Sequence, residues 1–296
     1  MNRKLIAEFK YAPAPVIRGY NKRSLYINLS TGEIKEKPVT ELMIDKFVGG
    51  KGFDLYLMWH AIKDETKWDS PENEICISFG PLCGNTSYPG SGKSIVTTIS
   101  PLTGIPVDCN VGGHFGPYTK FSGWDAIELQ GIAKEEVIIY INGDKGVVQI
   151  LSAPDEEINS HIFAEELIKE FADSEDKYQF VSVVSSGKAA ENVLITCLNF
   201  SFWDKRRKVA RLKQAGRGGT GSVFRHKKIK ALVVKYSGLK VDSNNPVDVE
   251  TLRKRGLKLH QEIEAGDSTQ NRMRQVGTAH LMEIMNDYDL LPIRNF

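Results

Sequence analysis

The sequence has few cysteines and histidines, and neither kind is clustered. Its 296 residues include four cysteines, which form no Cys-x-x-Cys pair, and six histidines, which form no His-Glu-x-x-His motif. These absences exclude a zinc or iron–sulfur centre built by this chain alone. Strand-like residues flank each cysteine, so we expect small buried side chains. The cysteines are Cys76, Cys83, Cys109 and Cys197.

Long apolar runs and a strong net charge are also absent. No apolar run approaches the ~18 residues of a membrane span, and the N-terminus lacks the apolar region of a signal peptide. We therefore expect a cytoplasmic protein without a membrane span. The 39 Lys and Arg residues nearly balance the 37 Asp and Glu residues, which gives nucleic-acid binding no support. A basic run over residues 205–213 is compatible with a solvated surface, and its role stays open.

The composition is that of an ordinary globular protein, 41% apolar and long enough for about two domains. Strand patterns dominate as far as residue 240. Residues 24–34 and 137–150 predict hairpins, with turns at Thr31-Gly32 and Asn142-Gly143. Further strands are predicted at Glu74–Phe79, Ser94–Ile99, Ala126–Gln130, Gln179–Val184, Val193–Leu198 and Ala231–Lys235.

Helical patterns interrupt and then replace the strands. Residues 42–62 predict a helix broken at Gly49-Gly50, and residues 160–172 predict another. From Asn245-Pro246, a good N-cap followed by a good first helical residue, the pattern is helical. The sequence thus predicts an N-terminal extension, a β-rich domain and the first helices of an α-helical domain, over residues 1–22, 23–242 and 243–296.

Two glycine motifs imitate nucleotide-binding signatures. Gly216-x-Gly218-x-x-Gly221 fits the dinucleotide fingerprint in its letters, but a charged run precedes it where that motif needs a buried strand. Pro89-Gly-Ser-Gly-Lys-Ser94 ends like a P-loop, yet Ser87 stands where a glycine is needed, and a strand-like run follows. A P-loop-like nucleotide-binding protein remains the alternative function.

Glycine-rich turns separate the predicted strands, and two of them are alike. Asn110–Gly116 and Gly216–Gly221 share a Gly-Gly pair followed closely by another glycine. Glycine lets the backbone approach a ligand closely, and Lys213 and Arg217 favour an anionic one. Two interpretations stand side by side: glycines that close tight hairpins, and two related phosphate cradles.

A series of motifs in a fixed order is more specific than any single loop. They are Arg23-Ser-Leu-Tyr-Ile-Asn-Leu-Ser-Thr-Gly-Glu-Ile34, Val48-Gly-Gly-Lys-Gly-Phe53, Gly80-Pro-Leu-Cys-Gly84, Ser100-Pro-Leu-Thr-Gly104, Asn110-Val-Gly-Gly-His-Phe-Gly116, Lys120-Phe-Ser-Gly-Trp-Asp-Ala-Ile127 and Ala215-Gly-Arg-Gly-Gly-Thr-Gly221. Over residues 20–296 the chain resembles the aldehyde:ferredoxin oxidoreductase family of tungsten enzymes. That family includes oxidoreductases for aldehydes and a related subunit that reduces aromatic acyl-CoA thioesters.

The resemblance implies an α+β fold. Its β-rich N-terminal domain would consist of two related sheets that form a base for a tungsten bis-pyranopterin cofactor, with molybdenum as the alternative metal. The start of an all-α domain would follow. The base would mainly hold the pterin phosphates and the magnesium ion that bridges them.

The resemblance also assigns residues. Lys93 stands where the family usually has an arginine, which keeps the charge but loses the bidentate geometry. Asn110 stands where a backbone carbonyl holds the magnesium, and Gln214 is the equivalent position in the second sheet. The other implied cofactor-binding residues are Val111, Gly112, Gly113, Lys213, Ala215, Gly216, Arg217, Gly218 and Gly219.

The sequence ends just before the point where the family has its Cys-x-x-Cys-x-x-x-Cys ligands for a [4Fe–4S] cluster. The family's acid–base residues are missing too, so no catalytic residue is assigned. We expect one part of a split enzyme, inactive when it is alone: a second chain would carry the remaining helical domains and the cluster, and a ferredoxin-like subunit would exchange electrons with it. A non-catalytic relic or adaptor is the alternative. Nothing selects the substrate or the direction of reaction.

Overall fold

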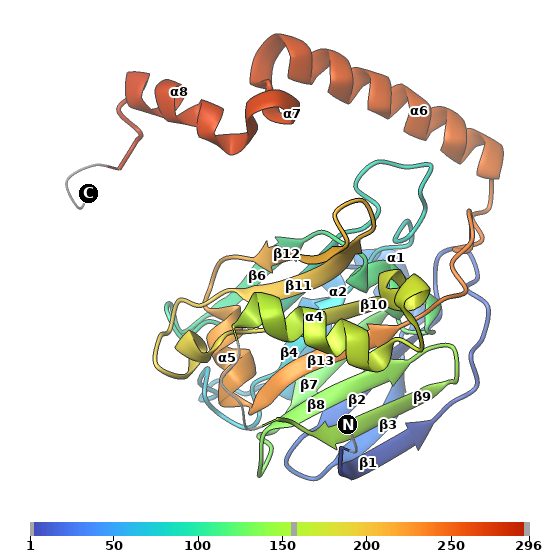
Figure 1. Cartoon of the computed structure of the whole chain (residues 1–296), viewed down its shortest axis with the longest axis vertical. Coiled ribbons are helices and arrows are strands. Elements are labelled where there is room, and N and C mark those ends of the chain that lie inside the picture. Colours follow the sequence, from blue (N-terminus) through green and yellow to red (C-terminus); the bar gives the residue numbers. More distant parts are fainter. Residues whose placement is uncertain (1–2, 155–158, 293–296) are drawn as a thin grey trace. The chain divides into compact units, whose positions relative to one another are not determined.

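The computed structural model describes residues 3–154 and 159–292 (Figure 1). The chain divides into two compact units, which are described separately. The first comprises the described residues up to Asn85 together with Gly90–Val247, and the second comprises Thr86–Pro89 and the residues from Asp248 onward. The predicted boundaries after residues 22 and 242 stay a prediction.

A six-stranded sheet forms the first half of unit 1, in the strand order β3-β2-β7-β4-β5-β6. Its neighbouring strands are antiparallel except for the parallel pair β2 and β7. The strands are β2 (Arg23–Asn28), β3 (Glu33–Pro38), β4 (Ile75–Ser78), β5 (Ser94–Ile99), β6 (Pro106–Val111) and β7 (Ala126–Gln130). The helices are α1 (Glu41–Phe47) and α2 (Lys51–Ala61) after β3, and α3 (Phe115–Phe121) between β6 and β7.

A seven-stranded sheet forms the second half, in the order β1-β9-β8-β13-β10-β11-β12. Its single parallel pair is β8 and β13. The strands are β1 (Leu5–Lys10), β8 (Val137–Asn142), β9 (Val147–Ser152), β10 (Val181–Ser185), β11 (Leu198–Asp204), β12 (Val209–Ala215) and β13 (Ile229–Lys235). The helices are α4 (Ser160–Phe171) after β9, the short 3-10 helices Glu175–Phe180 and Lys188–Glu191, and α5 (Thr220–His226) between β12 and β13.

The two halves share one topology. When β1 is set aside, each sheet has the same strand order, with its parallel pair at the same place and a short helix before its last strand. The register agrees as well, because Ser94 pairs with Val111 in the first sheet as Leu198 pairs with Ala215 in the second. The predicted α+β fold with two related sheets is confirmed.

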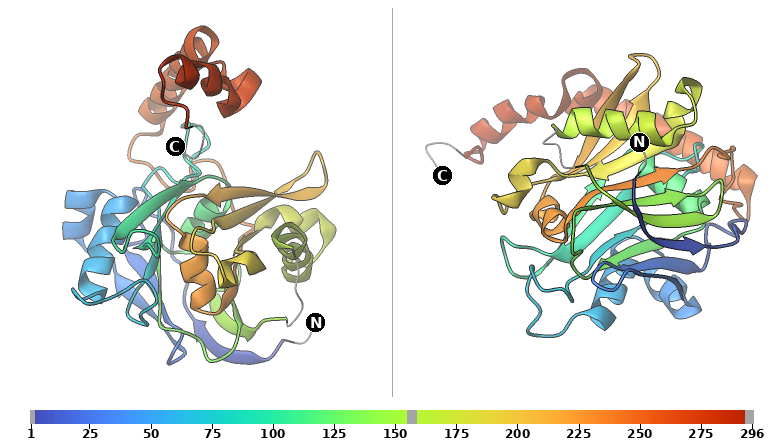
Figure 2. Two further views of the ribbon diagram at one scale, coloured as in Figure 1. Left: turned by 90° about the vertical axis from the view of Figure 1, so that its left-hand side faces the viewer. Right: turned by 60° about the horizontal axis from the view of Figure 1, so that its bottom comes forward.

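The halves stack in four layers (Figure 2, left). The facing sides of the sheets share one apolar core, while α1 and α2 cover the outer side of the first sheet and α4 that of the second. Asn159 caps α4, since its side chain accepts a hydrogen bond from the His161 N–H at 2.9 Å. The buried face of α4 consists of Phe163, Ala164, Leu167 and Ile168. Each large apolar side chain buried there stabilises the fold by about 1.5–3 kcal/mol.

The predicted break in the first helical segment is confirmed. Val48, Gly49 and Gly50 all have positive φ, at 62°, 152° and 55°. A side chain at Gly49 would place its Cβ only 2.7 Å from the Phe79 carbonyl oxygen. Glycine is therefore required between α1 and α2, because the backbone passes close to the end of β4 in a left-handed conformation.

Two strand predictions were wrong in part. Val193–Leu198 is not a strand: β11 begins at Leu198, and Ile195 lies in the preceding loop with 64% of its surface exposed. In Gln179–Val184 the strand starts only at Val181, because a 3-10 helix precedes it. A run of apolar, β-branched residues predicts a strand whether the run is buried or exposed. The predicted start of each of these two strands was therefore too early.

The context inferred for Gly216–Gly221 was also wrong. The loop does follow a strand, β12, and it does open a helix, α5. The dinucleotide fingerprint still does not apply, because β12 is an edge strand and β13 pairs with β8 and β10 rather than with β12. The two strands therefore do not form the parallel βαβ unit that the fingerprint needs.

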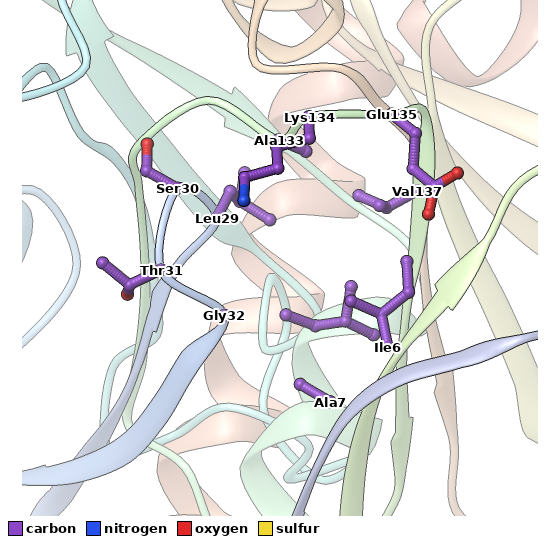
Figure 3. Close-up of a pocket in the computed structure, with 11 residues that line it drawn as sticks. Ile6, Ala7, Leu29, Ser30, Thr31, Gly32, Ala133, Lys134, Glu135 and Val137 are labelled. Atoms are coloured by element: carbon purple, nitrogen blue, oxygen red, sulfur yellow. The ribbon is translucent and has the colours of Figure 1, made fainter.

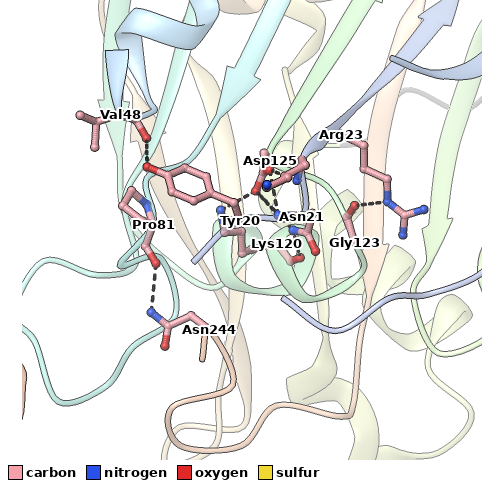
Figure 4. A network of polar contacts seen from close by, with 10 residues as sticks. Tyr20, Asn21, Arg23, Val48, Pro81, Lys120, Gly123, Asp125 and Asn244 are labelled. Atoms are coloured by element: carbon pink, nitrogen blue, oxygen red, sulfur yellow. Dashed lines mark hydrogen bonds and ion pairs between the residues drawn. The ribbon is translucent and has the colours of Figure 1, made fainter. Parts of the chain in front are cut away.

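A buried ion pair holds the segment before β2 (Figure 4). Lys120 Nζ lies 2.6 Å from Asp125 Oδ1, and both side chains are fully buried. Asp125 also accepts hydrogen bonds from the backbone N–H groups of Asn21 and Lys22, and the Asn21 amide donates to the Lys120 carbonyl. Because each buried charge has partners, the pair fixes this segment to α3 and β7. These residues of the sequence motif thus serve the fold.

Unit 2 is helical, with α6 (Val249–Gly266), a π turn (Asp267–Asn271), α7 (Met273–Val276), a 3-10 turn (Gly277–His280) and α8 (Leu281–Asp287). The predicted helical pattern is confirmed, but α6 begins after Asp248, whose side chain accepts from the Thr251 N–H at 2.9 Å, and not at Pro246. Gly256 packs against Ser87, where a Cβ would come within 1.9 Å of the carbonyl oxygen. In the described part of the chain no helix is long and apolar enough to cross a membrane.

Candidate functional site

The edge strands β6 and β12 meet along one side of unit 1. The Arg217 N–H donates to Cys109 Sγ at 3.4 Å, and a Cβ at Gly218 would lie 2.5 Å from Val107. At the other end of the same contact, Gly113 approaches Lys213. The two strands therefore run antiparallel, and each is followed by one of the glycine loops. We call residues 106–113 and 209–219 the edge seam.

The first loop of the edge seam is open. No atom lies within 4 Å of the position that a Gly112 Cβ would occupy. Gly113 has a φ of 116°, and its carbonyl oxygen lies 2.8 Å from the Cβ position of Gly92, so residues 92 and 93 border the loop. Lys93 is exposed and directly precedes β5. The loop thus leaves space for a ligand beside an exposed cation.

The second loop is open at one residue only. Gly216 has free space around its Cβ position, whereas Gly218 and Gly219 have φ values of 73° and 68°. A Cβ at Gly219 would overlap the Leu194 carbonyl oxygen at 2.1 Å. Packing therefore accounts for Gly218 and Gly219 without a ligand, and their predicted cofactor-binding role stays a prediction.

Lys213 belongs to the second sheet but lies beside the first loop. Its Cγ lies 4.0 Å from the Cβ position of Gly113. Lys93, Lys213 and Arg217 are all exposed, and within residues 3–154 and 159–292 no carboxylate forms an ion pair with any of them. The edge seam therefore carries positive charge that the described part of the chain does not neutralise.

Backbone groups at the seam are available as well. Asn110 and Gln214 occupy equivalent places, each next to last in its strand and exposed, whereas Val111 and Ala215 are buried and anchor the loops. Among the described residues, the N–H groups of the loop glycines Gly112, Gly113 and Gly216 donate to no backbone carbonyl. Free N–H groups beside lysine and arginine are the donors that suit an oxygen-rich dianion.

The residues present fit a cofactor with two phosphate groups. Each half of unit 1 offers one open glycine position, and three unpaired cations lie beside them. Among the described residues, no group of three or more His, Cys, Asp or Glu side chains is placed to hold a metal ion. A magnesium ion at the seam would thus depend on backbone carbonyls and on phosphate oxygens.

Sequence reasoning missed one member of the seam, Cys109, and one residue that borders it, Gly92. Cys109 was expected to be only a small buried side chain, but its sulfur accepts the Arg217 N–H and so joins the two sheets. Gly92 approaches Gly113 closely. The glycine-rich run around Gly92 carried a signal, although it suggested a P-loop, whereas no spacing in the sequence connects Cys109 with Arg217.

A separate cavity of about 260 Å³ lies where β1 and the β2–β3 turn meet the segment that links the halves (Figure 3). Apolar residues such as Leu29, Val137 and Ile150 line it together with the polar residues Ser30 and Lys134. None of the predicted site residues lines it. The sequence-predicted site and this cavity are therefore distinct.

Three comparisons with known proteins agree with this geometry. Residues 24–236 match the family profile described as aldehyde ferredoxin oxidoreductase, N-terminal domain. The tungsten-containing aldehyde ferredoxin oxidoreductase of Pyrococcus horikoshii is 35% identical over 280 residues, which cover 94% of this chain and 43% of that protein. The aliphatic sulfonate oxidoreductase, WOR-like subunit, of Pyrococcus furiosus is 28% identical over 241 residues, covering 74% of this chain and 35% of that protein.

Among solved structures, the active site complex BamBC of benzoyl coenzyme A reductase in complex with 1,5-dienoyl-CoA is similar, with a TM-score of 0.64 and 30% identity over 74% of this chain and 31% of that chain. The chain thus spans less than half the length of the curated relatives it matches. The resemblance inferred from the ordered motifs is confirmed. With its two related sheets and a profile match over residues 24–236, the chain belongs to the aldehyde ferredoxin oxidoreductase family and carries the family's N-terminal domain.

Proposed function

We propose that this chain is the cofactor-binding part of a tungsten bis-pyranopterin oxidoreductase that acts on an aldehyde, an oxo group or an aromatic acyl-CoA thioester. Molybdenum is the alternative metal. The observation that carries the proposal is the edge seam, where two equivalent loops from two related sheets offer open glycine positions beside unpaired cations. Tungsten-containing relatives support the choice of metal.

The chain's own contribution is binding and orientation. Lys93 and Lys213 would pair with a phosphate at the first loop, where the N–H groups of Gly112 and Gly113 donate to no backbone carbonyl among the described residues. The second phosphate would lie at Gly216 and Arg217. When bound, the cofactor would supply two-electron redox chemistry.

Magnesium would be held by the backbone carbonyls of Asn110 and Gln214, which end equivalent strands. Carbonyl oxygens are hard ligands that suit this ion. Because lysine is a point charge on a flexible stem, Lys93 would attract a phosphate without the fixed fork of an arginine. We assign no catalytic residue to the chain.

A partner chain is the second part of the proposal. The described helices of unit 2 expose apolar side chains: Ile263 is 51% and Met282 57% exposed. We propose that a second chain with the remaining helical domains and a [4Fe–4S] cluster covers them, and that a ferredoxin-like protein exchanges electrons with the cluster. Co-expression with a chain that carries Cys-x-x-Cys-x-x-x-Cys near its start should yield a complex with tungsten and iron. A metal-loaded, active monomer of this chain alone would contradict the partner proposal.

Metal analysis of the purified complex tests the cofactor. Because the bound cofactor would bury the pair between Lys213 and its phosphate, Lys213→Ala should weaken cofactor retention by about 2–5 kcal/mol, the range for removing one partner of a buried charge pair. Lys205→Ala is the matched control, because Lys205 is exposed in the β11–β12 turn, and its effect should stay within about 0.5 kcal/mol. Tungsten and pterin content unchanged by Lys213→Ala would argue against phosphate binding at the seam. Stabilisation by ATP or GTP without metal would favour a nucleotide-binding protein instead.

A further inference from the structure

His114 extends from the first loop of the edge seam toward the second sheet. It directly follows Gly113 and is the N-cap residue of α3. The centroid of its ring lies 5.6 Å from that of Tyr118 in α3 and 5.6 Å from that of Phe202 in β11. The imidazole is thus held between one ring from each half of unit 1, at the edge of the open loop.

One hydrogen bond determines the tautomer of His114. The Tyr118 hydroxyl donates its single proton to the Gln179 carbonyl oxygen, with an O–O distance of 2.5 Å. Toward His114 Nδ1, 3.3 Å away, the same hydroxyl oxygen can only accept. Nδ1 therefore carries the proton in the neutral ring, and Nε2 keeps a free lone pair.

The surroundings of the ring disfavour its charged form in the free protein. The residue as a whole is exposed, but its ring lies at a tilt to the rings of Tyr118 and Phe202, and desolvation lowers the pKa of His114. Lys213 approaches Gly113, the residue before His114, and Arg211, the ladder partner of Phe202, forms an ion pair with Asp204 at 3.5 Å. Among the described residues no carboxylate bonds to His114. A bound anion beside the ring would instead favour its charged form.

We propose that His114 is a further ligand-binding residue of the edge seam, which takes up a proton from solvent when a phosphate group binds and donates it through Nε2 in a hydrogen bond to a phosphate oxygen. The ligand class is a phosphate monoester or diphosphate, and the inference rests on the proposed function. Tyr118 acts through His114: by accepting from Nδ1 it leaves Nε2 as the nitrogen that can gain a proton.

Inorganic sulfate is a suitable probe, because it is a tetrahedral dianion that does not titrate near neutral pH. Nitrogen-15 NMR of the full chain should show the Nδ1–H tautomer of His114 without sulfate. Saturating sulfate should raise the pKa of His114 by about one unit, as an opposite charge within hydrogen-bond distance does. His114→Gln should weaken sulfate binding about fivefold at about pH 6 and less than twofold at about pH 8.

Two variants separate this inference from the proposed function. Tyr118→Phe should leave sulfate bound but allow both tautomers of His114, whereas Lys213→Ala should weaken sulfate binding at both pH values. Sulfate binding that depends on Lys213 while the pKa and tautomer of His114 stay unchanged would overturn the role of His114 and leave the proposed function standing. Sulfate binding that depends on neither residue would overturn both.

Discussion

The two halves of unit 1 share a topology but differ in what lies under their outer helices. In the second half, α4 packs on a largely apolar surface. In the first half, α2 covers a row of polar side chains across the sheet. The apolar surface includes Ile138, Val181, Val183, Ala231 and Val233, and the polar row includes Glu74, Cys76, Thr97 and Glu128. The two halves thus share an apolar core between the sheets, whereas their outer layers differ in polarity.

The polar row contains carboxyl groups in two different states. Glu128 is fully paired, with the Ser24 hydroxyl at 2.7 Å and Lys37 Nζ at 2.5 Å. Asp54 of α2 accepts from the Thr97 hydroxyl at 2.8 Å, but its other oxygen has no partner among the described residues, and the same holds for one oxygen of Glu74. Burial raises the pKa of Asp54 and of Glu74 to about 8. Near neutral pH these two carboxyl groups are therefore largely protonated.

The largest loss of stability is expected when alanine replaces a tightly packed glycine of the two loops. Gly219→Ala adds a Cβ that overlaps the Leu194 carbonyl oxygen at a residue with positive φ, so we expect a loss of at least about 3 kcal/mol in the free energy of unfolding. Gly112→Ala and Gly216→Ala have free space and are matched controls, with changes within about 1 kcal/mol. Urea unfolding of the full chain measures all three. Equal midpoints for Gly219→Ala and Gly216→Ala would show that the second loop is as open as the first.

The polar row should make the first half sensitive to pH. Between about pH 4 and about pH 8 the unfolded chain loses the Asp54 proton while the folded chain keeps it, so stability falls as the pH rises through this window. Asp54→Asn keeps an acceptor for Thr97 and removes the titration. It should raise the free energy of unfolding at about pH 8 by about 2–4 kcal/mol and flatten its dependence on pH.

Glu128→Gln is the control for Asp54→Asn, because it removes a paired charge and leaves Lys37 without its partner. This variant should destabilise the chain at about pH 7, by about 1–3 kcal/mol. Denaturant unfolding at a series of pH values tests both variants. A variant Asp54→Asn that is less stable than the parent at about pH 8 would mean that the carboxyl group is ionised and paired.

The smallest effect is expected at the strand ends. Asn110 and Gln214 are exposed and equivalent, and the proposed magnesium contact uses their backbone carbonyls. Asn110→Ala and Gln214→Ala should therefore each change stability and cofactor retention by no more than about 0.5 kcal/mol. Cofactor content after gel filtration is the measurement. Marked loss in one variant alone would show that a side chain takes part and that the two halves bind unequally.

Local patterns predicted the elements whose neighbours in sequence decide them. Turn residues predicted the hairpins around Thr31-Gly32 and Asn142-Gly143, and two adjacent glycines predicted the break between α1 and α2. The alternation of apolar and polar residues did not predict β12, because this exposed edge strand carries Arg211 and Lys213 and resembles a charged loop in sequence. The resemblance to the family, rather than periodicity, predicted the two related sheets.

The seam itself could not be read from local patterns. The approach of Lys213 to Gly113 and the bond from the Arg217 N–H to Cys109 join residues about 100 positions apart in the chain. The protonation state of Asp54 could not be predicted either, because its pKa depends on the burial of this α2 residue against the first sheet and not on its neighbours in sequence. Contacts of this kind appear only when the two sheets are placed face to face.

The strand β1 is the one strand of the second sheet without a counterpart in the first. It pairs with β9 along residues 5–10 and lies beside β3, the outermost strand of the first sheet. Without it, β9 would present a row of unpaired N–H and C=O groups, the kind of template on which chains add to one another edge to edge. As the edge strand in place of β9, β1 is short and partly charged, which makes it less suited to such pairing. A version of the chain trimmed before Arg23 would keep the whole edge seam and yet be prone to self-association.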